Sequence, residues 1–228
     1  MRWTKWTFAA LFLAWLAAEP VAAQQAPSAP QARFVVVLDA AHGGEETGGH
    51  LANGQFEKTF TLALTIRLRS LLGARGIQVF TTRESDTAVE PQRRAEIANH
   101  AAAQACLSVH ASEAGSGVHL FVSSLAPAQP VRFPAWKTAQ GAFVSRSLKL
   151  AGVINSALLQ AGISTTLART TLPVIDSMTC PAVAVEIAPE RSALQETTAG
   201  LGDPDYQARV AAALAAALVE WRSEAHQP

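Results

Sequence analysis

Three short, mostly apolar runs in this chain each lead into a side chain that can bind a metal ion or transfer a proton. The runs are residues 34–38 before Asp39 and His42, residues 106–109 before His110, and residues 182–185 before Glu186. Apolar runs of this length that stop at polar or Gly-rich sequence are typical of buried strands in a parallel sheet. Ligands of open α/β sheets bind beyond the carboxyl ends of the strands. The sequence therefore predicts that these side chains gather at one edge of a sheet.

The rest of the chain alternates strands with helices. Strands are expected at 34–39, 77–82, 106–110, 117–123, 172–175 and 182–187. Helices are expected at 57–72, 91–103 and 139–161, and from Asp203-Pro204 through Trp221, with a proline-rich loop at 124–135. This alternation predicts an α/β fold, a single-domain sandwich whose mostly parallel central sheet has about six strands and helices on both faces.

The N-terminal residues are expected to lie outside this fold. A basic start, an apolar stretch and small residues before Gln24 form the pattern of a secretory signal peptide over residues 1–23. An uncleaved membrane anchor is the alternative, but Glu19-Pro20 interrupts the stretch well short of the ~20 residues of a span. Residues 24–33 have the composition of a linker, so the domain would occupy residues 34–224.

Charge and cysteine content narrow the possible partners. Lys plus Arg and Asp plus Glu both number 18, and no basic run is present, so no nucleic-acid partner is expected. Cys106 and Cys180 are the only cysteines, and export would place them in an oxidising compartment. A disulfide between them is open, but without geometry we favour two separately buried thiols.

Three residues supply the ligand types of a catalytic zinc site. Such a site takes three side chains from His, Asp and Glu and keeps a fourth position for water. His42, Glu57 and His110 have these types, and Glu57 opens the helix after the first strand. Glu186 would be the general base that accepts the proton of a water and passes it to a leaving nitrogen. Asp39 would orient the His42 ring from behind the ligands.

Each residue also has a plainer explanation. A lone His at a strand end is more often a surface or core residue than a ligand, and Glu57 alone would be favoured by the helix dipole. His50 is the rival ligand, and the Glu45-Glu46 pair is expected to be solvated. His119 could line the crevice or fill the core, and we favour the core or its rim. The agreement of four residues at one predicted edge puts the metal site on an equal footing with these plainer explanations.

Five segments, in order and with compatible spacing, resemble the zinc-dependent N-acetylmuramoyl-L-alanine amidases of the amidase-3 type. They are Asp39-Ala40-Ala41-His42-Gly43-Gly44 (similar to the family's Asp-Pro-Gly-His-Gly-Gly), Glu57-Lys58, Thr82-Arg83 through Asp86 with Arg94 and Ala98-Asn99, Ser108-Val109-His110-Ala111, and Val174-Ile175 with Pro181 through Glu186. The similarity covers most of residues 34–221. Two departures stand out: Ala40-Ala41 replaces Pro-Gly, and residues 187–192 replace the family's usual Leu-Gly-Phe-Leu-Ser-Asn.

The resemblance implies zinc-dependent hydrolysis of the amide bond between the lactyl group of N-acetylmuramic acid and L-alanine in peptidoglycan. It implies Zn²⁺ as cofactor, His42, Glu57 and His110 as its ligands, and Glu186 as the catalytic residue. We expect an exported monomer of the periplasm or cell wall that binds muropeptides and has no membrane span after signal cleavage. Two alternatives stay open: a zinc peptidase that acts on wall peptides, and a non-catalytic peptidoglycan-binding or regulatory domain of the same fold.

Some members of this family carry an extra helix that covers the metal until a partner protein displaces it. That helix lies between the fourth strand and the long helix, where this chain has only residues 124–138 with Pro127, Pro130 and Pro134. Proline disfavours a helix interior, and an isolated helix needs ~12–15 residues to be even marginally stable. We therefore expect permanently open access to the metal.

Overall fold

A computed structural model describes residues 33–132, 135–192, 194 and 196–225. The expected signal peptide and nearly all of the expected linker lie outside these residues. Among the described residues, no single helix combines the length and the apolar composition of a membrane span. A bent pair, the 3₁₀ helix at Trp136–Ala142 with the helix at Val144–Gln160, reaches both limits only when its members are taken together.

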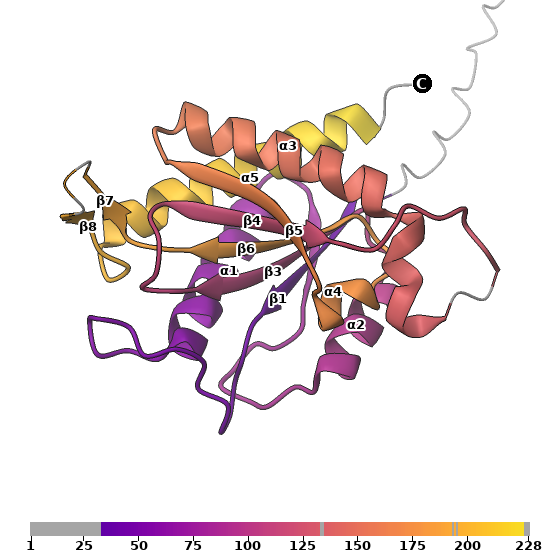
Figure 1. The fold of residues 1–228 in the computed structure, drawn as a ribbon, viewed down its shortest axis with the longest axis horizontal. Coiled ribbons are helices and arrows are strands. Elements are labelled where there is room, and N and C mark those ends of the chain that lie inside the picture. Colours follow the sequence, from indigo (N-terminus) through magenta and orange to yellow (C-terminus); the bar gives the residue numbers. More distant parts are fainter. Residues whose placement is uncertain (1–32, 133–134, 193, 195, 226–228) are drawn as a thin grey trace, which may run out of the picture. The chain divides into compact units, whose positions relative to one another are not determined.

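A six-stranded sheet with the order β2-β1-β3-β6-β4-β5 forms the centre of the domain (Figure 1). Its strands are β1 (Val35–Ala40), β2 (Gln78–Thr81), β3 (Ala105–Ala111), β4 (Val118–Ser123), β5 (Thr165–Thr170) and β6 (Ala182–Ile187). All neighbouring strands are parallel except β4 and β6, which are antiparallel. The prediction of a mostly parallel sheet of about six strands is confirmed.

Helices cover both faces of the sheet, as predicted. The helices α1 (Glu57–Gly73), α3 (Val144–Gln160) and α5 (Pro204–Ala225) pack on one face of the sheet, and α2 (Pro91–His100) and α4 (Pro173–Asp176) pack on the other (Figure 1). The larger core lies on the first side, where Leu64, Ile154 and Leu214 pack against Leu107 and Val185. His110 and Glu186 point to the second side, because their neighbours Val109 and Val185 belong to the larger core.

Several elements differ from the sequence-based expectation. The segment expected as a strand at 172–175 is the short helix α4, which Pro173 opens. The expected helix at 139–161 is a 3₁₀ helix at Trp136–Ala142 followed by α3. The edge strand β5 was not expected, because most of its residues are exposed and it has no apolar run. A small hairpin of β7 (Glu190–Arg191) and β8 (Thr197–Ala199) follows β6.

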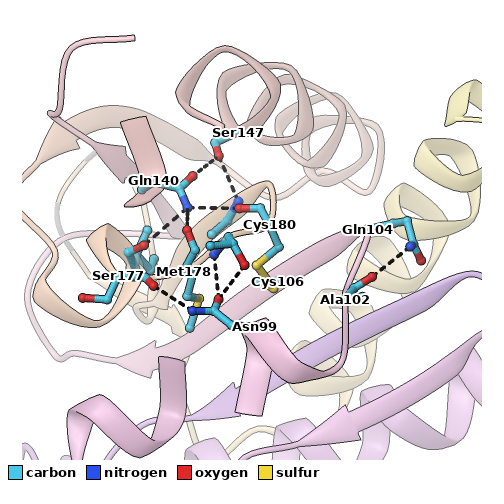
Figure 2. Close-up of a disulfide and its surroundings, with 12 residues drawn as sticks. Asn99, Ala102, Gln104, Cys106, Gln140, Ser147, Ser177, Met178 and Cys180 are labelled. Carbon is cyan, nitrogen blue, oxygen red and sulfur yellow. Dashed lines mark hydrogen bonds between the residues drawn. A yellow bond between two sulfur atoms is a disulfide. The ribbon is translucent and has the colours of Figure 1, made fainter. Parts of the chain in front are cut away.

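The prediction of two separate thiols is wrong, because Cys106 and Cys180 form a disulfide (Figure 2). Cys106 in β3 is paired with Ala182 in β6, and Cys180 lies two residues before Ala182. This register brings the two Cα atoms to 6.2 Å, within the range that a disulfide spans. Figure 2 also shows Gln140 beside the bond, donating hydrogen bonds to the Met178 and Cys180 carbonyls.

Candidate metal centre

The three expected ligands meet at the carboxyl ends of β1 and β3. Nε2 of His42 lies 3.1 Å from Oε2 of Glu57, and Nδ1 of His110 lies 3.1 Å from Oε1 of the same carboxylate. One ligand atom from each residue lies within 4.8 Å of the other two. Two imidazoles and one carboxylate fit the usual ligand set of a catalytic zinc, so the described residues can hold that ion.

A left-handed backbone conformation aims the His42 ring at this cluster. His42 has φ +61°, which non-glycine residues rarely adopt. Its carbonyl accepts a hydrogen bond of 2.7 Å from the buried Arg94, whose guanidinium also contacts the Ala40 carbonyl and the Asp39 carboxylate. Arg83 adds hydrogen bonds to the carbonyls of Ala40 and Ala41. Two buried arginines thus fix the turn that presents the first ligand.

The glycine-rich loop lets the chain pass close to the ligands. Gly48 has φ +66°, and a Cβ atom there would lie 2.6 Å from the His42 ring and 2.7 Å from the Glu57 carboxylate. The next residue, Gly49, donates its backbone N–H to Glu57 at 2.9 Å. Any side chain at position 48 would therefore push two of the three ligands out of place.

Hydrogen bonds keep Glu57 ionised in spite of its burial. Burial raises the pKa of Glu57, but hydrogen bonds from His110, His42 and the backbone N–H groups of Gly49 and Ala111 outweigh burial and hold that pKa well below its usual range. The hydrogen bond with Glu57 is also the main cause that raises the pKa of His42, against the opposite effect of burial. Glu57 is therefore a carboxylate at neutral pH, as a metal ligand must be.

Glu186 lies beside the cluster, one strand beyond His110. The two residues are direct partners in the parallel pairing of β3 with β6, so their side chains leave the same face of the sheet. Glu186 is partly buried, and in the described part of the chain its carboxylate has no hydrogen bond or ion pair. A carboxylate in this state is free to accept a proton from a molecule bound at the metal site.

Asp39 lies behind the cluster but does not contact the His42 ring as expected. Its carboxylate accepts hydrogen bonds from Ser108 at 2.7 Å, Thr82 at 2.8 Å and Arg94 at 2.7 Å. The Ser108 hydroxyl lies 3.4 Å from Nε2 of His110. Asp39 is thus connected, through Ser108, to the second histidine and not to the first.

The residue that contacts the far side of the His42 ring is Glu46, which was expected to be a solvated charge. Its Oε1 lies 3.1 Å from Nδ1 of His42, and its side chain is 70% exposed. The backbone pairing of Gly43 with Glu46 brings this carboxylate back over the histidine. The four-residue spacing to His42 was the only signal in the sequence, and such spacing is uninformative outside a helix.

The other candidate residues lie elsewhere. His50, the rival ligand, packs edge-on against Phe56 and is outside the cluster. His119 in β4 is partly exposed and faces the side of the sheet opposite the larger core, with Nδ1 at 2.6 Å from the Thr166 hydroxyl. Its expected place in the core is therefore wrong, and its place at the rim is closer to the structure.

A cleft of about 220 Å³ opens beside the cluster. His42, His110 and Arg94 line its polar side, and Pro91, Val174 and Ala184 line its apolar side. Of this apolar side, α2 contributes Pro91, β6 contributes Ala184 and α4 contributes Val174. The disulfide and Gln140 connect the segment around α4 to the rest of the domain (Figure 2). A ligand in this cleft would contact both histidines from the side of α2 and α4.

The sequence of this chain is similar to those of known amidases. The profile of the N-acetylmuramoyl-L-alanine amidase family of the amidase-3 type matches residues 36–220. N-acetylmuramoyl-L-alanine amidase AmiA of Escherichia coli K12 is 43% identical over 77 residues, which are 34% of this chain and 27% of that protein. The germination-specific N-acetylmuramoyl-L-alanine amidase of Bacillus subtilis 168 is 32% identical over 97 residues, 36% of this chain and 40% of that protein. The aligned segments thus span less than half the length of these relatives.

Solved structures share the fold over a larger part of the chain. The catalytic domain of CwlV, an N-acetylmuramoyl-L-alanine amidase from Bacillus (Paenibacillus) polymyxa var. colistinus, has a TM-score of 0.65 and 28% identity, with 83% of this chain and 98% of that chain covered. Ami1 from Mycobacterium smegmatis has a TM-score of 0.68 and 24% identity, with 84% and 97% covered. Because Ami1 is only 24% identical, its similarity to this chain shows a shared fold and nothing further.

Proposed function

The chain belongs to the N-acetylmuramoyl-L-alanine amidase family of the amidase-3 type, and we propose that it hydrolyses the amide bond between the lactyl group of N-acetylmuramic acid and L-alanine in peptidoglycan. The observation that carries the proposal is the cluster of His42, Glu57 and His110 with Glu186 on the neighbouring strand. The names of its relatives support the same reaction and bond.

We propose zinc as the ion held by His42, Glu57 and His110. When bound, zinc supplies a Lewis acid that polarises the scissile carbonyl and makes water more acidic. Glu186 accepts the proton of the attacking water and delivers it to the nitrogen of the departing L-alanine, as base and then as acid. Glu46 and Ser108 hold the two imidazoles from the sides that face away from Glu57.

We also propose that the protein acts outside the cytoplasm, in the periplasm or at the cell wall. The buried disulfide supports this location, because disulfides persist in oxidising compartments and are rare in the cytosol. The N-terminal residues with signal-peptide composition agree with it. The substrate is found in the same compartment.

Digestion of purified peptidoglycan tests the function directly. Identification of the new termini by mass spectrometry should show free L-alanine amino groups and intact lactyl carboxylates on the muramic acid. New termini within the peptide would instead indicate the zinc peptidase. Binding to sacculi without any new terminus would indicate the non-catalytic domain.

A further inference from the structure

The strand register extends the proposed active site beyond Glu186. His110 in β3 is paired with Glu186 in β6, Glu186 with His119 in β4, and His119 with Thr166 in β5. Paired residues of neighbouring strands point to the same face, so these four side chains form one row across the sheet. At about 4.8 Å per strand, the row is about 14 Å long. We call the outer pair, His119 and Thr166, the distal pair.

Contacts on both sides of the His119 ring hold the distal pair in place. The Thr166 hydroxyl lies 2.6 Å from Nδ1 of His119. On its other side the ring packs against Gly115, which has φ +83° and where a Cβ atom would lie 2.2 Å from Nε2 of His119. Both members are at least partly exposed, while their neighbours Val118 and Leu120 fill the core on the opposite face. Core packing therefore does not account for His119.

Residues 187–192, which depart from the family pattern, hold the loop that contains Gly115. Arg191, in β7, donates hydrogen bonds to the carbonyls of Gly115 at 3.0 Å and Glu113 at 3.1 Å. Its backbone N–H also donates to the Ser116 hydroxyl at 3.0 Å. The altered residues at 187–192 therefore fix the glycine against which His119 packs, and they act on the distal pair through that contact.

We propose that the distal pair is a subsite for the stem peptide, the part of the substrate that departs as the amine. This proposal rests on the proposed function. Glu186 delivers the proton to the departing nitrogen, so the peptide must lie on the Glu186 side of the metal cluster, away from β1. Beyond Glu186 on that side the row continues with the distal pair, in which the exposed Thr166 hydroxyl offers a hydrogen bond to a peptide carbonyl or carboxylate group. The His119 ring, held between Gly115 and Thr166, orients that hydroxyl through Nδ1. The muramyl side then faces the cleft between β1, α2 and α4.

Kinetics on substrates of two peptide lengths test this assignment. The substrates are N-acetylmuramoyl-L-alanine and N-acetylmuramoyl-L-alanyl-γ-D-glutamyl-diaminopimelate. His119→Ala removes the ring that orients the Thr166 hydroxyl, and it should lower kcat/KM on the longer substrate about fivefold to tenfold, mostly through KM. The same variant should act on the shorter substrate like the wild type, and His119→Gln should recover most of the loss.

Thr166→Val provides a variant that removes only the hydroxyl from an exposed strand position. Thr170→Val is its matched control, because Thr170 lies on the same strand and the same face, four residues from the row. The first should raise KM for the longer substrate, and the second should leave it unchanged. Equal losses on both substrates, or no loss on either, would overturn the subsite.

Binding of the free tripeptide L-alanyl-γ-D-glutamyl-diaminopimelate, measured by calorimetry, tests the subsite without catalysis. His119→Ala and Thr166→Val should each weaken this binding about fivefold, while Thr170→Val should not. Equal affinities in all variants would overturn the subsite even if the wild type is active. A wild type that binds the tripeptide through the distal pair but cleaves neither substrate would instead refute the proposed function.

Discussion

Oε1 of Glu46 lies 3.1 Å from Nδ1 of His42, the ring nitrogen that faces away from Glu57. A carboxylate in this position fixes the tautomer and the orientation of a metal-binding imidazole. The contact places an exposed loop residue beside one of the proposed zinc ligands, and it differs from the contact with Asp39 that the sequence suggested.

Glu46→Ala should therefore weaken zinc binding about 10-fold to 100-fold, the usual cost of losing such a partner. Zinc affinity measured by competition with a chelator checks this value. Glu45→Ala is the matched control, since it removes a neighbouring exposed carboxylate that has no contact with His42 in the described residues. Equal affinities in the two variants would contradict a role for Glu46.

Zinc affinity should fall as the pH falls from 8 to 5. The hydrogen bond with Glu57 raises the pKa of His42 above its ordinary value, so this ring takes up a proton that competes with the ion. Glu57 stays ionised throughout, because its pKa lies well below the usual range. Chelator competition at several pH values measures the effect, and an affinity that does not change across this range would contradict it.

Without zinc, His42 and Glu57 should make contributions to folding stability that depend on pH in opposite directions. A raised folded-state pKa contributes stability below the unfolded value of about 6.5, and this contribution is lost as the pH rises through the folded value. Glu57, with a lowered pKa, contributes above about pH 4.3 and loses its contribution only at lower pH. Urea unfolding after dialysis against a chelator, with His42→Gln as the reference, isolates the histidine contribution.

Reduction of the disulfide should destabilise the domain by about 3–4 kcal/mol, because the bond closes a long loop in the unfolded chain. Unfolding of the Cys106→Ser/Cys180→Ser protein, compared with the oxidised wild type, measures this difference. Gln140 and Asn99 hold the same segment through hydrogen bonds, so the double variant should remain folded (Figure 2). A difference below about 1 kcal/mol would contradict this prediction and would show that the hydrogen bonds of Gln140 and Asn99 hold the segment without the disulfide.

The mature protein should cleave peptidoglycan without an activating partner. The side chains of His42 and His110 are 20% and 37% exposed, and the described residues between β4 and the 3₁₀ helix form no helix that covers them. Turbidity loss of purified sacculi with zinc and the mature chain alone measures this activity. Activity that requires a second exported protein would contradict open access.

The sequence was sufficient to predict that the proposed ligands lie together, because their positions follow from strand ends and a helix start. His42, His110 and Glu186 each follow an apolar run, and the edge rule for parallel sheets brings such residues together. Glu57 was identified because a helix start follows the glycine-rich loop. Each of these signals is local, because it can be recognised from the pattern of apolar residues near it in the sequence.

The features that the sequence missed depend on contacts between distant segments. The disulfide needs the β3–β6 register, and the Glu46 contact needs the left-handed backbone at His42 that Arg94 stabilises. The strand β5 has exposed threonines in place of an apolar run. Its sequence therefore shows neither the two-residue period of a strand nor the 3.6-residue period of a helix. The four residues of α4 are too few to distinguish a helix from a strand by pattern.

Zinc content and turnover, measured on the same preparations of Glu186→Gln and His110→Ala, test most directly the claim that Glu186 transfers the proton at a zinc site. Glu186→Gln should keep one zinc per chain and release muropeptide products about 10²-fold to 10⁴-fold more slowly, because the amide cannot accept the proton. His110→Ala should lose its zinc. Near wild-type turnover by Glu186→Gln, or full zinc content in His110→Ala, would contradict this assignment of the site.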